Sequence, residues 1–313
     1  MHRVLLSGWF SFLHGEVTTG DVLALRRVQE VLHRAGVPYD TAWSPVFRPG
    51  ALRLTDAAPE AYSHVVFLCG PLQGPEVEVL HRQFAGCVRI AVGTSVPDAG
   101  TPAAARFHSV LPREAPGTAP PLDLAALAPG TAPVPVVGLI LGQGRHGQHG
   151  HGHGHGREAV HALTRWLGAQ DCARLPLDTH LDSGDWRLCA HPGQVQSLLG
   201  RLDTVVTDRP HGLVLALRAG VPVLAVDPVA GGAAVTAQAR ACDWPAVVAA
   251  DRVGFAECER WWSWCLEAGG RRLARERSAG LTPARTHDRA HELLSVLRAF
   301  GSGEDGHPAL KDC

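Results

Sequence analysis

Short, wholly apolar runs alternate with helix-like segments along most of the chain, and this alternation constrains the fold more than any other feature. The runs 64–70 (HVVFLCG) and 221–227 (VPVLAVD) show no polar face, which is typical of strands buried on both sides of a parallel sheet. Between such runs, segments such as 19–36 repeat apolar residues at helical spacing and end at glycine. The expected strands are 3–8, 39–43, 64–70, 89–95, 134–142, 172–178, 203–208, 221–227 and 246–251. The expected helices are 19–36, 74–86, 157–169, 192–202, 212–220, 255–280 and 284–300.

A stretch dense in Pro, Ala and Gly at 112–135 separates two such series and indicates a linker. We therefore predict two doubly wound, Rossmann-like α/β domains, 1–131 and 132–300, followed by a disordered tail at 301–313. Sheets of this kind bind ligands beyond the carboxyl ends of their strands. The sequence thus predicts a ligand site in a cleft between the two domains.

Composition narrows the class of protein. Charged residues make up 19% of the chain and the formal net charge is -1, which argues against a nucleic-acid or membrane-surface partner held by bulk charge. No apolar run approaches the roughly 20 residues of a membrane span, and the amino-terminal run is too short for a signal peptide. The eight cysteines are scattered without a C-x-x-C pair, which predicts free thiols and no zinc site. A cytoplasmic protein is expected.

The stretch Thr207-Asp208-Arg209-Pro210-His211-Gly212 stands between an expected strand and an expected helix. The amino end of a helix carries unpaired N–H groups and positive potential, so it can hold an anion. Arg209 adds a planar fork for phosphate or carboxylate, and His211 adds a group that can move a proton near neutral pH. We predict an anion and acid/base site here that includes Gly212. The alternative is that Asp208 caps the helix and Arg209 is a solvated surface residue.

Two further turns have a similar position. Thr19, Gly20 and Asp21 open the first expected helix, where the glycine would let a ligand approach the backbone. Gly231 and Gly232 lie between a strand and a helix and would present free N–H groups toward a ligand. A plain capped helix start is the alternative for the first turn, and a glycine pair is by itself weak evidence.

Histidines are most frequent in a Gly-rich tract, GRHGQHGHGHGHG, at 144–156. Neutral imidazoles can bind Ni²⁺, Cu²⁺ or Zn²⁺, but alternation with glycine fixes no ligand geometry. The tract lies in an expected loop, where repeat expansion is tolerated. A solvated loop is therefore the leading interpretation, and we assign no metal ligand.

The block 203–245 closely resembles the carboxyl-half signature of the polysaccharide pyruvyl transferase family, and the opening 3–37 is similar to the start of that family's pattern. Segments 88–96 and 110–117 resemble the next two parts of that family's pattern, a turn at a strand end and a short segment with an arginine and an acidic residue. The resemblance implies a glycosyltransferase-like, GT-B-like fold and an enzyme of the cell envelope. That enzyme would move the pyruvyl group of phosphoenolpyruvate to a sugar of a polysaccharide or glycolipid precursor, with loss of phosphate and without another cofactor.

The resemblance also implies roles for residues. Arg209 and His211 correspond to the family's Arg-x-His and would hold the phosphoenolpyruvate anion, with His211 as proton donor or acceptor. Arg113 matches a further anion contact. The chain departs from the family at Pro210, which stands for an aliphatic residue, and at Ala234, which stands where relatives carry lysine.

Two other functions remain open. One is a nucleotide-sugar glycosyltransferase on the same fold, although no acidic ribose-binding signature follows 203–245. The other is a non-catalytic or metal-handling protein that works through the histidine tract. The sequence does not decide the acceptor sugar or the oligomeric state, and a homo-oligomer is possible.

Overall fold

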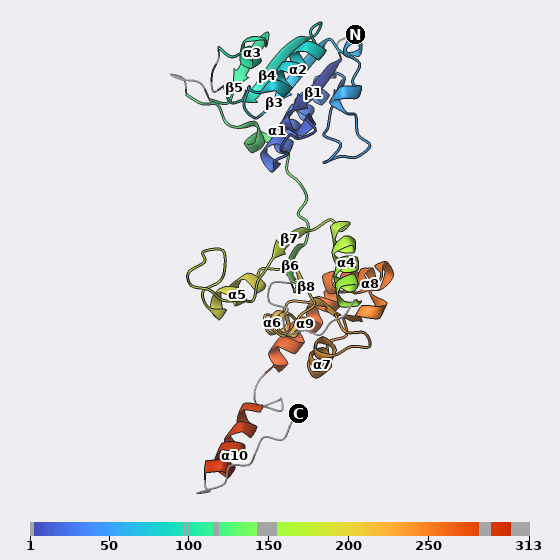
Figure 1. The fold of residues 1–313 in the computed structure, drawn as a ribbon, viewed down its shortest axis with the longest axis vertical. Coiled ribbons are helices and arrows are strands. Elements are labelled where there is room, and N and C mark those ends of the chain that lie inside the picture. The colour runs from blue at the N-terminus through green and yellow to red at the C-terminus, as the bar shows by residue number, and fades with distance from the viewer. Residues whose placement is uncertain are drawn as a thin grey trace. The chain divides into compact units, whose positions relative to one another are not determined.

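Every strand pairing among the described residues is parallel, as the wholly apolar runs require. The computed structural model describes residues 3–96, 98, 100–114, 119–142, 155–281 and 289–301. The chain divides into two units, Met1–Ala132 and Pro133–Cys313, and each is built on one five-stranded sheet with helices on both faces (Figure 1). Two doubly wound α/β units are the predicted fold class, which is confirmed.

The first unit has the strand order β2-β1-β3-β4-β5. Its strands are β1 (Val4–Gly8), β2 (Tyr39–Thr41), β3 (His64–Leu68), β4 (Val88–Thr94) and β5 (Ser109–Pro112). The helix α1 (Thr19–Arg34) packs on one face of the sheet through Leu25, and α2 (Pro75–Gln83) and α3 (Pro102–Ala105) pack on the other through residues such as Leu80. Alternate residues of β1 therefore enter two separate apolar layers.

Part of the expected linker at 112–135 belongs to the first unit. The strand β5 ends at Pro112, and a short 3-10 helix, η4 (Leu124–Leu127), follows. Asp123 starts this turn by accepting a hydrogen bond from the N–H of Ala125 at 2.8 Å. Leu124 packs on the apolar layer beneath α1. Pro and Ala content alone did not reveal this docking, because it depends on a tertiary contact.

The second unit has the strand order β10-β9-β8-β6-β7. Its strands are β6 (Val136–Ile140), β7 (Ala173–Pro176), β8 (Thr204–Thr207), β9 (Val223–Asp227) and β10 (Val247–Ala249). Its helices are α4 (His155–Gly168), α5 (Pro192–Leu199), α6 (Pro210–Arg218), α7 (Ala234–Ala241), α8 (Phe255–Leu266), α9 (Ala268–Gly280) and α10 (Arg289–Gly301). The buried side chains of α5, α6, α7 and α9 share one apolar layer together with Cys265 of α8, and those of α4 share the other with Cys258 and Trp262 of α8.

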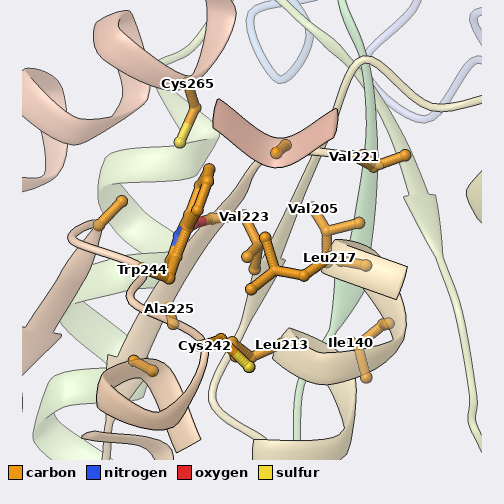
Figure 2. Close-up of a cluster of buried hydrophobic side chains, with 14 of the residues drawn as sticks. Ile140, Val205, Leu213, Leu217, Val221, Val223, Ala225, Cys242, Trp244 and Cys265 are labelled. Carbon is orange, nitrogen blue, oxygen red and sulfur yellow. The ribbon is translucent and has the colours of Figure 1, made fainter. Parts of the chain in front are cut away.

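The larger core of the second unit lies beneath α6. Figure 2 shows Leu213 and Leu217 of this helix gathered with Val205 and Val223 of the sheet. Trp244 closes the layer and donates from its indole N–H to the carbonyl of Val223 at 2.7 Å. Burying an aromatic ring together with its one polar group in this way adds apolar contact without an unsatisfied donor. This packing fixes α6, and hence the turn before it, against the sheet.

The expected long helix at 255–280 is wrong in one respect, since it is two helices. Glu267, with φ -78° and ψ 166°, breaks the helical path between α8 and α9. A Cβ on Gly270 would lie 2.4 Å from the carbonyl oxygen of Trp264, so only glycine fits this tight turn. Helical periodicity continues on both sides of the break and concealed it in the sequence.

No helix among the described residues is both long enough and apolar enough to span a membrane. The tail 302–313 lies outside those residues. So does the Gly–His tract, apart from the two positions that open α4.

The turn between α8 and α9 gives a testable prediction. We expect Gly270→Ala to lower the free energy of unfolding by about 1–3 kcal/mol, because the added methyl group meets backbone atoms that cannot move independently. Gly269→Ala is the matched control, since its Cβ would lie 3.6 Å from the nearest atom, the indole nitrogen of Trp264. Urea denaturation of both variants measures the effect. Equal stability of the two would contradict the steric assignment.

Candidate functional site

The second sheet has a topological switch point between β6 and β8. From β6 the chain crosses to β7 on one side, and it then returns to β8 on the other side. In open parallel sheets a crevice forms at the carboxyl ends of two strands so arranged, and ligands bind there. Gly142 lies just beyond β6 and Asp208 just beyond β8, so the stretch singled out in the sequence stands at this position.

Two hydrogen bonds join the ends of β6 and β8, and a third fixes the turn that follows β8. The buried hydroxyl of Thr207 donates to the carbonyl of Ile140 at 2.7 Å and accepts from the N–H of Arg209 at 3.0 Å. The N–H of Gly142 donates to Asp208 Oδ1 at 2.8 Å. Burial raises the pKa of the Asp208 carboxyl, while this N–H and the nearby charge of Arg209 oppose the rise. Asp208 therefore holds the residue after β6 and does not cap α6.

The amino end of α6 is pressed against the end of β8. A Cβ on Gly212 would lie 2.2 Å from Thr207 Oγ1, so glycine is needed for this approach. Arg209 is the N-cap residue, and no side chain caps the helix. Pro210 occupies the first helical position, where the missing N–H has no intrahelical partner to lose. Pro210 thus suits the start of the helix.

Arg209 and His211 flank this proline. The side chain of Arg209 is half-buried and forms no hydrogen bond or ion pair with the part of the chain that the structure describes. His211 is exposed in the first turn of α6. The structure therefore brings together, at one corner, an unpaired guanidinium, an imidazole and an uncapped helix end. Such a corner can bind a small anion and move a proton beside it.

The glycine pair after β9 lies in a loop that is organised around Asp227. Asp227, at the end of β9, is fully buried. Its carboxylate accepts from the N–H groups of Val229 at 3.1 Å, Ala233 at 2.6 Å and Thr236 at 2.8 Å. Two N–H groups at the start of α7, those of Ala233 and Thr236, are therefore already engaged. Burial alone would raise the pKa of this carboxyl, but the three donors together hold it below its ordinary value.

Gly231 and Gly232 serve the turn that allows this arrangement, with φ of 77° and 87°. The N–H of Gly232 donates to the carbonyl of Val229 at 2.9 Å. These glycines shape the loop. The N–H of Gly232 is engaged within it, and ligand binding by the glycine pair stays a prediction. The aspartate at the strand end was the signal in the sequence that could have indicated a self-capped helix.

In the first unit, three candidate residues lie at the start of α1, where Asp21 forms hydrogen bonds within the helix cap. Asp21 and Thr18 form a reciprocal cap at the start of α1, with Thr18 Oγ1 donating to Asp21 Oδ2 at 2.8 Å. This is the plain capped helix that the sequence left as an alternative. Thr19 opens the helix and Gly20 faces open space, with Thr18 Oγ1 the nearest atom to its Cβ position at 3.7 Å.

Arg113, just beyond β5, is not a free cation. Its guanidinium donates to Glu114 Oε2 at 2.8 Å and to Ser95 Oγ at 2.8 Å, and Asp123 lies 3.7 Å away. Glu114 is the next residue in the chain, whereas Ser95 follows β4 and Asp123 precedes η4, so spacing in the sequence does not reveal these two contacts. The described residues contain no cluster of three or more His, Cys, Asp or Glu side chains that could hold a metal ion.

No family model and no curated protein sequence matches the chain. Among solved structures, the chain is similar to the calicheamicin glycosyltransferase CalG4, with 15% identity, 96% of this chain and 99% of that chain covered, and a TM-score of 0.34. It is similar to MurG of Acinetobacter baumannii, with 12% identity, coverage of 95% and 99%, and a TM-score of 0.34. It is also similar to the glycosyltransferase SnogD of Streptomyces nogalater, with 14% identity, coverage of 95% and 99%, and a TM-score of 0.30. What the site can do chemically is therefore argued from the residues of this chain and not from these similar structures.

Asp227 gives a prediction for stability against pH. Its lowered pKa means that its contribution is present above the ordinary value of about 4 and is lost as pH falls through the folded value. Asp227→Asn would place an amide donor against N–H groups, so we expect a loss of about 2–4 kcal/mol at pH 7. The variant should also lack this part of the acid destabilisation.

Denaturation of the wild type and the variant between pH 7 and pH 3 measures both effects. Asp171→Asn is the control, because Asp171 is exposed. A variant that is as stable as the wild type at pH 7 would refute the role of Asp227.

Proposed function

We propose that the chain is a transferase that uses phosphoenolpyruvate to place a pyruvyl ketal on a sugar. The observation that carries this proposal is the corner at the start of α6, where Arg209 has no carboxylate partner among the described residues and α6 has no side-chain cap. A compact donor with several negative charges needs converging cations and N–H groups of this kind. The resemblance of 203–245 to the pyruvyl transferase family supports the same donor.

The residues of the corner fit the steps of this reaction. Arg209 and the N–H groups at the start of α6 hold the phosphate and carboxylate of the donor. His211 delivers a proton to C3 of the enol phosphate as a sugar hydroxyl oxygen bonds to C2, and the proton of that hydroxyl passes to solvent. A second hydroxyl of the same sugar then displaces phosphate from C2 and closes the ketal, and the departing phosphate takes up the proton of this second hydroxyl. The products are the ketal and inorganic phosphate, so no oxidant or reductant is consumed.

Asp208 has a positioning role in this scheme. Its carboxyl is bonded to the N–H of Gly142 at 2.8 Å and lies beside Arg209. It therefore fixes the residue after β6 against the donor corner, and its own charge is offset by the neighbouring guanidinium. The donor would meet a surface that is preorganised by the sheet and not by a loose loop.

The proposal predicts the effect of substitutions at the corner. We expect His211→Gln to lower kcat by about 10²–10⁴-fold, because a positioned proton donor is lost. Arg209→Ala should lower kcat/KM for phosphoenolpyruvate by about 10²-fold or more, and Arg209→Lys should recover only part of it because lysine lacks the planar fork. Arg218→Ala, at the far end of α6, is the matched control and should keep full activity.

Phosphate release from phosphoenolpyruvate, measured with a mixture of glycan acceptors, provides the readout. Unchanged activity of the Arg209→Ala and His211→Gln variants beside a working wild type would overturn the site assignment.

One observation favours a second candidate, a nucleotide-sugar glycosyltransferase. Trp186 is 91% exposed and lies in the loop that follows β7, at the same edge of the sheet. The turn beneath it is held firmly, since Asp182 Oδ1 accepts from the N–H of Gly184 at 2.7 Å and Asp185 pairs with Arg187 at 2.7 Å. A fixed, bare indole is a surface on which a nucleobase can stack.

Ligand-dependent melting temperatures separate the two candidates, because a ligand stabilises the state that it binds. Under the leading proposal, phosphoenolpyruvate raises the melting temperature of the wild type and of Trp186→Ala equally, and uridine or adenosine diphosphate has no effect that depends on Trp186. Stabilisation by a nucleoside diphosphate that disappears in Trp186→Ala, without an effect of phosphoenolpyruvate, would establish the second candidate instead.

A further inference from the structure

A cavity of the second unit lies along the edge strand β10. Its volume is about 380 Å³, within the range of pockets that take whole small molecules. No strand among the described residues pairs with the outer side of β10, so the edge of the sheet forms its floor. Residues of α7 and of α8 form its walls, and these two helices belong to opposite faces of the sheet.

Some of the charged side chains that line this cavity form an ion pair and others do not. Glu257 and Arg260 form an ion pair at 2.9 Å, and Arg260 also lies over the ring of Trp261 at 4.5 Å. Arg240 and Arg252 have neither a hydrogen bond nor an ion pair from their side chains among the residues that the structure describes. Asp251 is the remaining lining carboxylate and is exposed. The unpaired lining charge is therefore positive by one.

The two free arginines reach the cavity from different ends. Arg240 belongs to the last turn of α7, and Arg252 follows the carboxyl end of β10. The three residues of β10 extend over about 7 Å, so the two cations border an elongated space. Thr236 also lines the cavity, and its buried hydroxyl lies beside the carboxylate of Asp227. The two guanidinium forks suit the linked oxygens of a diphosphate.

The position of the cavity connects it to the corner at α6. The strands β8, β9 and β10 are neighbours, so the end of β10 lies about 10 Å from the end of β8, two strand spacings away. A sugar joined to a diphosphate can bridge that gap, with its hydroxyls at the donor corner and its phosphates along β10.

We infer that the cavity along β10 binds a diphosphate through Arg240 and Arg252, and that this diphosphate belongs to the sugar acceptor. The second part rests on the proposed function. The acceptor class is then a sugar carried on a diphosphate, as in an activated glycan precursor, and not a finished neutral polysaccharide.

Calorimetric titration with inorganic pyrophosphate tests the site without reference to catalysis. We expect the double variant Arg240→Ala/Arg252→Ala to weaken pyrophosphate binding by about tenfold or more, since each arginine provides charge-assisted hydrogen bonds. The double variant Arg165→Ala/Arg218→Ala removes the same charge from exposed positions of the same unit and should bind as the wild type does.

The Arg209→Ala variant distinguishes this site from the donor corner. Pyrophosphate should bind it with unchanged affinity, and saturating phosphoenolpyruvate should not displace pyrophosphate from the wild type. Loss of binding in Arg209→Ala, competition by phosphoenolpyruvate, or equal binding by the two double variants would each overturn the proposed site.

A steady-state assay separates this inference from the proposed function. With a diphosphate-linked sugar acceptor, Arg240→Ala/Arg252→Ala should raise KM for the acceptor and leave KM for phosphoenolpyruvate unchanged. Arginine-dependent pyrophosphate binding without any turnover of phosphoenolpyruvate would leave the site standing and refute the proposed reaction. Turnover whose acceptor KM is insensitive to both arginines would sustain the reaction and refute the acceptor site.

Discussion

The hydroxyl of Thr207 ties the carboxyl ends of β6 and β8 together, and the geometry of the candidate site depends on it. This one group donates to Ile140 and accepts from the N–H of Arg209, so it sets both the spacing of the two strands and the direction in which the chain leaves the sheet. Gly212 then packs directly over it. The start of α6 is thus positioned by the buried sheet. This explains how the backbone positions of Arg209 and His211 are fixed although their side chains are half-buried and exposed.

The elements that the sequence predicted are those with local signals. The corner at Arg209 was predictable because a buried strand, a proline at the first helical position and a glycine follow one another within a few residues. The break at Glu267 was not, because helical spacing continues on both sides and the close approach of Gly270 to Trp264 exists only in the folded chain. The contacts of Arg113 with Ser95 and Asp123 were equally hidden, since these residues are distant from it in the sequence.

The arginines at this side of the second unit divide into two kinds. Arg187 and Arg260 have carboxylate partners close in the sequence, which neutralise them where they stand. The guanidinium groups of Arg209, Arg240 and Arg252 form no ion pair among the described residues, although the carboxyl of Asp208 lies beside Arg209. In a chain whose formal charge is only -1, such local cationic positions do not arise from overall composition. They are positions at which an anion from another molecule can bind.

Asp227 shows how an anion can be held at the start of a helix in this unit. One carboxylate oxygen accepts from two N–H groups at the start of α7, and the other accepts from the turn before it. The chain therefore carries its own internal mimic of a bound anion at α7, while the neighbouring α6 has the same kind of opening without the mimic. A donor whose carboxylate binds as that of Asp227 does would place a negative charge at the start of α6, as Asp227 does at α7. The N–H groups at the start of α6 would then have an anionic partner only while the donor is bound.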